Sequence, residues 1–258
     1  MKIARIFCQT GPRLAAVGLA IALAGCAALS PGPRTPATRP QSEASVPGLL
    51  DPVVLWQHQN FPGKRATQYR PDRVENRDAT HALAVSSASM LRRSVRIEPA
   101  ELGALRFSWR VPALIASADL GDRDLADSPV RVVLAFEGDR SRLSARDAML
   151  SELAHTLTGE PMPYATLIYV WCNQRPSESV IHSPRTARVR KLVMESGPQR
   201  LGRWLDYERD IRADFEKAFG EPPGALVAVG IMTDTDNTGE TAQAWYGPLA
   251  LGTATKGN

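Results

Sequence analysis

The sequence predicts a mainly β protein built as an antiparallel sandwich or barrel, with two short helices. Short stretches of alternating apolar and polar side chains recur along the chain, and this is the period of a half-buried strand. Turn-rich segments such as Pro62-Gly63 and Asp236-Asn237 separate these stretches. Strands and helices do not alternate regularly, so we do not expect a parallel nucleotide-binding sheet.

Residues 1–25 have the order of an export signal, because basic residues precede the apolar run from Leu14 to Ala24. The motif Leu23-Ala24-Gly25-Cys26 resembles a bacterial lipobox. The resemblance implies cleavage before Cys26, a thioether-linked diacylglycerol on its sulfur and an acyl chain, such as palmitate, on its new amine. A membrane-spanning helix is the alternative, but it needs about 20 apolar residues and this run is shorter.

Several acyl chains on Cys26 would make membrane anchoring effectively permanent. The next residues are Ala27 and Ala28 rather than aspartate. In Gram-negative lipoproteins this pattern implies release to the outer membrane, so the expected location is the cell envelope, facing the periplasm. Residues 26–47 are rich in proline, which favours an extended spacer of about 3.1 Å per residue.

Charge and cysteine content limit the partners. The whole chain has a formal charge of +4, and residues 1–25 carry three basic and no acidic side chains, so the processed chain has 4 − 3 = +1. Such a chain lacks the basic field of a nucleic-acid binder, so nucleic acid is not an expected partner.

Of three cysteines, only Cys172 remains for the folded domain, which therefore depends on its apolar core. We expect a monomer.

The strands are predicted from N- to C-terminus by apolar runs and by alternation. In the third of them, Leu105, Phe107 and Trp109 alternate with Arg106 and Ser108, so one face is expected in the core. The predicted strands are Val53–His58, Ala82–Ser87, Ala104–Val111, Val130–Phe136, Ala165–Trp171, Ala187–Met194, Leu226–Met232 and Ala242–Leu251.

Two helices interrupt this pattern. Ser144 and Asp147 have the spacing of a capping box, and an apolar stripe follows up to Gly159. The second helix is indicated by apolar residues from Ile211 to Phe219, with Gly220 at the position of a left-handed C-cap.

Five motifs in the predicted domain stand out together. They are Phe61-Pro62-Gly63-Lys64, the run from Gly159 to Trp171, Leu201-Gly202-Arg203-Trp204, Phe219-Gly220-Glu221 and the run from Thr233 to Thr238. These motifs resemble a widespread bacterial family of exported proteins, domain of unknown function 3047. The resemblance extends from about Val53 to Leu251 and implies a single β-sandwich domain, jelly-roll-like and distantly similar to carbohydrate-binding modules. The helix predicted after Ser144 looks like an insertion.

The expected organisation has four parts. Residues 1–25 are the lipoprotein signal peptide, and residues 26–47 are the acylated cysteine with its proline-rich tether. Residues 48–252 form the β-sandwich domain, and residues 253–258 form a disordered tail.

Aromatic side chains are the first candidate site. Sugar rings present apolar C–H faces that stack on aromatic rings, while polar neighbours bind the hydroxyls. We expect Trp109 and Trp171 to fill the core, and Trp204 and Tyr246 to be more exposed. The hypothetical ligand-binding residues are Trp204, Tyr246, Tyr164, Glu160 and Arg209.

An acidic loop is the second candidate. Asp234, Asp236 and Asn237 follow an apolar strand and offer the hard oxygen ligands that calcium prefers. The alternative is an Asx-type turn, in which these side chains bind the local backbone. A structural calcium ion is the only cofactor considered, and a full shell needs about six to eight oxygens, of which the loop supplies part.

Other charged residues leave further alternatives open. Arg185, Arg188, Arg190 and Lys191 fit either a solvated strand edge or a weak site for an anionic polymer. Glycoside hydrolysis requires paired carboxylates at a defined separation, which sequence does not give. The carboxylates considered are Glu160, Glu208, Asp206 and Asp139.

No standard catalytic motif is present, and the four histidines lack metal-ligand spacing. The sequence therefore favours a non-catalytic, lipid-anchored envelope protein that binds a glycan or envelope polymer. The alternatives are an enzyme acting on a polysaccharide and a structural or protein-interaction lipoprotein.

Overall fold

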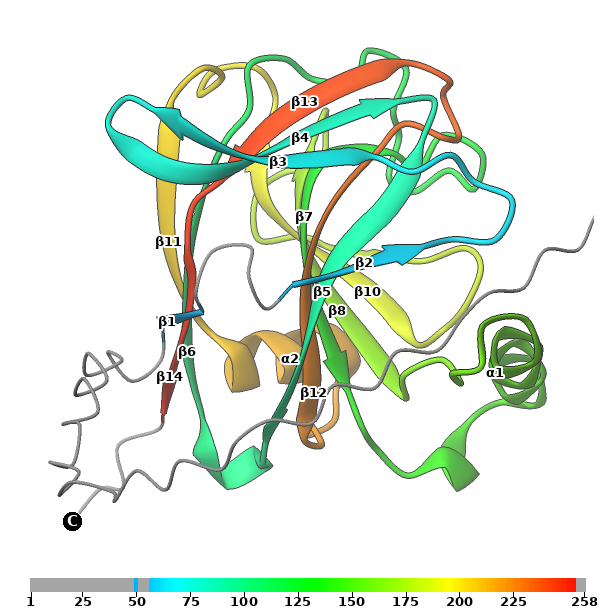
Figure 1. The fold of residues 1–258 in the computed structure, drawn as a ribbon. Coiled ribbons are helices and arrows are strands. Elements are labelled where there is room, and N and C mark those ends of the chain that lie inside the picture. Colours follow the sequence, from blue (N-terminus) through cyan, green and yellow to red (C-terminus); the bar gives the residue numbers. More distant parts are fainter. Residues whose placement is uncertain (1–48, 51–55, 254–258) are drawn as a thin grey trace, which may run out of the picture. The chain divides into compact units, whose positions relative to one another are not determined.

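The computed structural model describes residues 49–50 and 56–253 (Figure 1). The predicted signal peptide, Cys26 and the predicted tether lie outside the described residues. Among those described, no helix is both long and apolar enough to span a bilayer. The elements are β1 (Leu49–Leu50), β2 (Gln57–Asn60), β3 (Gln68–Val74), β4 (Arg77–Val85), β5 (Ala88–Ile97), β6 (Leu102–Arg110), β7 (Ser128–Phe136), α1 (Ala145–Thr158), β8 (Ala165–Cys172), β9 (Val180–His182), β10 (Val189–Ser196), β11 (Trp204–Asp210), α2 (Ile211–Phe219), β12 (Leu226–Asp234), β13 (Thr241–Tyr246) and β14 (Leu249–Thr253).

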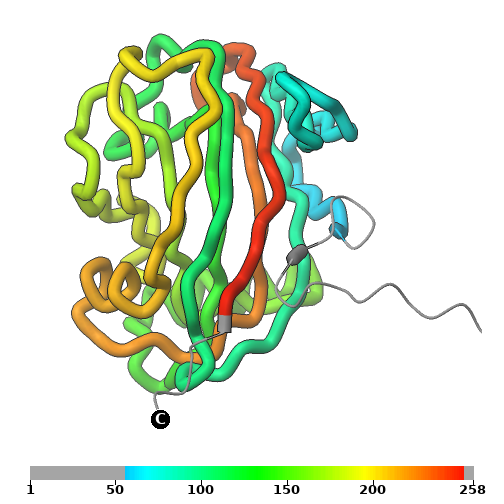
Figure 2. The backbone as a smooth tube through the Cα atoms, turned by 90° about the vertical axis from the view of Figure 1, so that its left-hand side faces the viewer, coloured from blue at the N-terminus to red at the C-terminus, as the bar shows by residue number. Residues whose placement is uncertain are grey.

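Two sheets confirm the predicted β-sandwich. Sheet A has the order β1-β14-β6-β13-β4-β3, and β11 pairs with the other side of β6. Sheet B has the order β2-β5-β12-β7-β8-β10-β9. Figure 2 shows β11, β6 and β14 running side by side. All described strand pairs are antiparallel except β8 with β10, which is parallel because residues 173–188 carry the chain back before β10 begins.

The core lies between the sheets and receives alternate residues from each strand. Trp109 of β6 and Trp171 of β8 are both buried, as predicted. The ring of Phe107 stacks on that of Tyr169 with centroids 5.5 Å apart, joining sheet A to sheet B. α2 closes one end, where Phe215 packs edge-on against Phe136 at 4.7 Å. Burial of these large side chains is the main stabilising contribution.

Several strands were not predicted because charged residues interrupt the alternation of apolar and polar side chains that marks a strand. β5 carries arginines and β11 carries carboxylates on the face that points to solvent, and β3 contains Pro71 near the sheet edge. The strand predicted over 242–251 is broken at Gly247-Pro248 into β13 and β14. The first predicted strand begins later than expected, at Gln57, and its residues 53–55 are outside the described part.

Both predicted helices are confirmed with their caps. The Ser144 hydroxyl accepts a hydrogen bond from the Asp147 amide at 3.1 Å, and Gly159 ends α1 in the left-handed region at φ 79°. Gly220 ends α2 in the same way at φ 69°. Only glycine adopts this conformation without strain, which explains why each helix ends there.

Candidate functional site

A row of side chains crosses the outer face of sheet A. Residues that face one another on neighbouring strands lie on the same side of a sheet, so the register defines the row. Trp204 of β11 pairs with Arg110 of β6, and Arg110 pairs with Trp245 of β13. His81 of β4 faces Trp245, and Arg70 of β3 faces His81. We call these five residues the tryptophan row.

Trp245 is held in place from several sides. Its ring stacks on His81 with centroids 4.9 Å apart, and the Arg110 guanidinium lies 5.3 Å from its ring centre. Its indole Nε1 donates to Asp72 Oδ2 at 2.8 Å. This hydrogen bond is the main reason why the pKa of Asp72 is lowered. The partly buried ring is therefore fixed in orientation before any ligand arrives.

A hollow of about 620 Å³ adjoins the other end of the row. Gly247 forms part of its lining, and a Cβ at this position would lie only 2.1 Å from Ser108 Oγ and 3.7 Å from the Trp204 ring. Glycine therefore allows the strand break to lie this close to the Ser108 hydroxyl, while the Trp204 ring is at ordinary van der Waals distance. The charged and polar side chains of the lining are Arg77, Asp78, Arg106, Ser108, Asp206 and Glu208.

The charges in the hollow are paired. Arg77 binds Asp206 at 2.8 Å and lies over the Trp204 ring at 5.5 Å, and Arg106 binds Glu208 at 3.0 Å. The hydrogen bond from Arg106 lowers the pKa of Glu208, which is therefore ionised at neutral pH. Trp204 Nε1 is buried and has no acceptor among the described residues. The Trp204 ring thus lies beside a hollow whose lining carries hydrogen-bond donors and acceptors.

This arrangement does not favour acid catalysis. Asp206 and Glu208 share the hollow, but both are paired with arginine, whereas a glycosidase needs one carboxyl group that keeps its proton near neutral pH. The other two carboxylates lie elsewhere. Glu160 binds Arg92 at 2.8 Å, and Asp139 accepts from the Ser141 amide at 3.0 Å.

The expected exposure of Tyr246 was wrong. Its ring is only 1% exposed, and its hydroxyl donates to the Met232 carbonyl at 2.6 Å between the sheets. Strand alternation explains the error, because Trp245 points outward and its neighbour must point inward. Trp245 was not selected from the sequence, although the alternation of β13 with small buried residues was the signal that would have identified it.

The remaining predicted ligand residues do not join Trp204. The Tyr164 ring lies 3.9 Å from the Arg188 guanidinium, and its hydroxyl donates to Glu221 at 3.1 Å. Arg209 binds Asp214 at 2.6 Å beside α2. Glu160 is on the sheet B side, in the segment between α1 and β8. The five predicted residues therefore do not form one groove.

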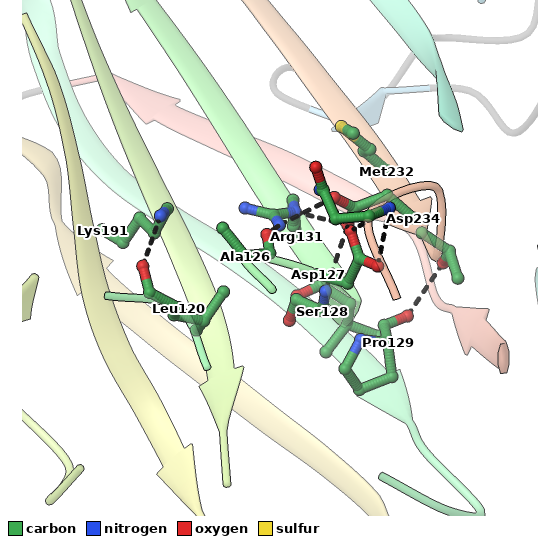
Figure 3. Close-up of polar contacts among 12 residues, drawn as sticks. Leu120, Ala126, Asp127, Ser128, Pro129, Arg131, Lys191, Met232 and Asp234 are labelled. Atoms are coloured by element: carbon green, nitrogen blue, oxygen red, sulfur yellow. Dashed lines mark hydrogen bonds and ion pairs between the residues drawn. The ribbon is translucent and has the colours of Figure 1, made fainter. Parts of the chain in front are cut away.

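The acidic loop is organised around a buried ion pair (Figure 3). Arg131 donates from Nε to Asp234 Oδ1 at 2.6 Å and from Nη2 to Oδ2 at 2.8 Å, and both side chains are buried. Burial raises the pKa of Asp234 to about 6, and pairing with Arg131 acts in the opposite direction. The carboxylate thus has a fixed cationic partner.

Calcium binding at this loop stays a prediction. Asp127, Asp234 and Asp236 each place a carboxylate oxygen within 4.8 Å of the others. Asp236 is also paired with Lys64 at 2.6 Å, and Asn237 donates from Nδ2 to Asp127 Oδ1 at 2.6 Å. The local hydrogen bonds are those of a side-chain-stabilised turn. The carboxylates therefore bind protein donors in this arrangement.

The basic strand is not a uniformly solvated edge. Lys191 is only 5% exposed and donates from Nζ to the Leu120 carbonyl at 2.7 Å. Burial lowers its pKa to about 7. Arg188 is paired with Glu221 at 2.6 Å, while Arg185 is exposed. β10 is not the edge strand, because the short β9 pairs with it.

Residues 54–250 match the model of a family described as "Protein of unknown function (DUF3047)". The match extends over most of the chain, and the chain belongs to this family. The resemblance inferred from the motifs is therefore confirmed. No curated protein matches the chain.

The fold is similar to several solved structures. The family 11 carbohydrate-binding module of cellulase Lic26A-Cel5E of Clostridium thermocellum shares 8% identity over 83% of this chain and 99% of its own, with a TM-score of 0.40. The xyloglucanase domain of NopAA, a type three effector from Sinorhizobium fredii in complex with cellobiose, shares 10% identity over 77% and 93%, with a TM-score of 0.39. The cellulose induced protein Cip1 shares 8% identity over 79% and 93%, with a TM-score of 0.34.

Proposed function

For this member of the DUF3047 family, we propose a non-catalytic, lipid-anchored envelope protein that binds a glycan or envelope polymer on the outer face of sheet A. The tryptophan row beside the hollow is the observation that carries this proposal. Trp204 and Trp245 are both partly exposed, on strands that flank β6. Two strand spacings separate them, about 10 Å, so one extended ligand can contact both rings.

The chemistry of the face suits a polymer of sugars. An aromatic ring offers an apolar surface to the C–H face of a sugar, while arginines and carboxylates bind its hydroxyls in fixed directions. Stacking with His81 and the hydrogen bond to Asp72 hold Trp245 in one orientation. Less conformational entropy is then lost when a ligand binds.

Charge pairing favours a neutral glycan over a strongly anionic one. The two arginines that line the hollow each have a carboxylate partner, Asp206 for Arg77 and Glu208 for Arg106. A polyanion would have to compete with these carboxylates and would be repelled by them. Hydroxyl groups can accept from the arginines and donate to the carboxylates without separating the pairs.

Acylation of Cys26 would hold this domain at the outer membrane, facing the periplasm. Intact-mass spectrometry of protein purified from its native membrane tests this part. We expect residues 1–25 to be absent and the mass to include the lipid on Cys26. Retention of residues 1–25 or an unmodified sulfur would contradict the anchor, independently of any result on glycan binding.

A glycan array followed by calorimetric titration of the best ligand tests the binding face. Trp204→Ala and Trp245→Ala should each weaken binding by about 2 kcal/mol, roughly thirtyfold, as expected for a central aromatic contact. Phe61→Ala removes a partly buried aromatic residue from the sheet B side and should leave the affinity unchanged.

Near-ultraviolet circular dichroism would establish that all three variants are folded. The proposed face would be rejected if the folded tryptophan variants bound as tightly as the wild type. The proposed function would be rejected if no glycan on an array that includes envelope polysaccharides bound above background.

A further inference from the structure

The outer face of sheet B carries an apolar groove of about 310 Å³. Its floor is formed by small side chains of the central strands, because β7 contributes Val133 and Ala135 and β12 contributes Ala228 and Gly230. The segment between α1 and β8 forms a wall over this floor. The other apolar lining residues are Phe61, Met90, Ala154, Pro161, Met162, Pro163 and Val229.

One ion pair lies at the rim of the groove. Arg92 of β5 binds Glu160 Oε2 at 2.8 Å, and both residues belong to the lining. Glu160 is exposed, whereas Arg92 is partly buried. An exposed pair of this kind contributes little to stability, so another carboxylate can replace Glu160 at small cost.

The adjoining helix presents its apolar side outward. Met149, Leu153 and Leu157 follow one another at i, i+4 and i+8 and are 64%, 53% and 61% exposed. The polar side faces the domain, where Asp147 accepts from Thr186 and Ser151 accepts from Arg140. Figure 1 shows α1 at the margin of the fold. Exposed apolar clusters of this kind mark binding surfaces.

We propose that this groove binds a single long acyl chain that ends in a carboxylate, as in a free fatty acid. The chain lies on the small residues of β7 and β12, and the carboxylate binds Arg92 in place of Glu160. Arginine suits this partner because its guanidinium can bind both oxygens of a carboxylate. The inference goes beyond glycan binding and does not depend on it, because it concerns the opposite sheet.

The lining favours this occupant over the alternatives. It has few hydroxyl or amide groups, so a sugar would lose hydrogen bonds to water on entry. The three exposed residues of α1 are too few for a stable interface with a second copy, which needs about 800 Å² on each partner. A flexible apolar chain also suits a groove in which Phe61 is the only aromatic lining residue.

Photo-crosslinking tests the proposal on the full acylated chain, held in lipid nanodiscs so that no detergent occupies the groove. The probe is a fatty acid with a diazirine in its chain, and mass spectrometry identifies the labelled peptides. We expect labelling in residues 158–163 or 228–230, and competition by unlabelled dodecanoate but not by dodecanol. Arg92→Gln should reduce labelling about tenfold.

Arg96→Gln is the matched control, because Arg96 lies on the same strand, is paired with Glu98 and Glu137, and does not line the groove. It should label like the wild type. Ala135→Phe, which fills the floor, should abolish labelling, and thermal melting would show whether this variant folds.

Three results would overturn the proposal. The first is labelling confined to the exposed side of α1, which would indicate contact with the bilayer. The second is equal labelling by a phospholipid that carries the same photoreactive chain. The third is labelling that persists in folded Arg92→Gln. Glycan affinity, measured on the same samples, reports separately on sheet A.

Discussion

The outer face of each sheet carries an arginine paired with a carboxylate, but the pair is exposed on sheet A and buried on sheet B. On sheet A, Arg106 and Glu208 form an exposed pair in an open hollow. On sheet B, Arg131 and Asp234 form a buried pair beneath residues 111–127, where Arg131 also donates to the Ala126 carbonyl. Water keeps the first pair weak and available, whereas burial makes the second pair part of the fold.

The covering loop explains this difference. Leu120 belongs to an apolar cluster with Ile168 and Val193 on the outer face of sheet B, and its carbonyl accepts from Lys191 (Figure 3). The loop thus covers one end of sheet B and leaves the apolar groove at the other. On sheet A, Asp206, Arg106 and Glu208 are exposed, so these polar groups can meet a soluble ligand.

The largest expected effect is the loss of the buried pair. Asp234→Ala leaves the Arg131 guanidinium buried without a counter-charge and should reduce the free energy of unfolding by about 3–5 kcal/mol. Urea denaturation measures this change. Asp206→Ala, which removes the partner of Arg77 on sheet A, should cost less than about 1 kcal/mol. Equal losses in the two variants would show that the faces do not differ as described.

The next effect is a pH dependence that belongs to sheet B. Burial lowers the pKa of Lys191 from its ordinary 10.5 to about 7. Between these values the unfolded chain binds more protons than the folded one, so stability should rise with pH from about 7 to about 10. The slope from one group is at most about 1.4 kcal/mol per pH unit.

Lys191→Met removes this ionisable group while keeping an unbranched side chain. The variant should lose the rise, giving a flatter plot of unfolding free energy against pH over the same range. An unchanged slope in Lys191→Met would mean that other groups cause the rise and that Lys191 is not buried as described.

The smallest expected effect concerns the exposed pairs. Arg106→Gln should change the free energy of unfolding by less than about 1 kcal/mol, and this small change should decrease further at high salt. Thermal melts at low and high ionic strength measure it. A loss above 2 kcal/mol would show that the hollow is structural rather than available for binding.

Much of the fold follows from local patterns in the sequence. Alternating residues such as Leu105 and Phe107 predicted the β6 strand, and Ser144 and Gly220 predicted helix ends, because caps depend on neighbouring residues. Trp204 was selected because it stands among charged residues, and the structure places it partly exposed on the outer face of sheet A. These features can be predicted from the sequence because each depends on a few residues in one segment.

The missed features depend on contacts between distant segments. Arg131 and Asp234 are 103 residues apart, and no local sequence pattern near either residue indicates that they form a pair. An apolar stripe at helical spacing ordinarily marks the buried side of a helix, but in α1 hydrogen bonds to Thr186 and Arg140 hold the polar side inward. The exposure of Tyr246 depends on the register of β13, which a shift of one residue would reverse.

Indole ¹H–¹⁵N spectra of the five tryptophans, recorded during titration with the best glycan ligand, test the central claim most directly. We predict that the signals of Trp204 and Trp245 shift in a saturable way, while those of the core residues Trp109 and Trp171 and of Trp56 stay in place. Binding that shifted neither Trp204 nor Trp245 would contradict the assignment of the ligand to the outer face of sheet A.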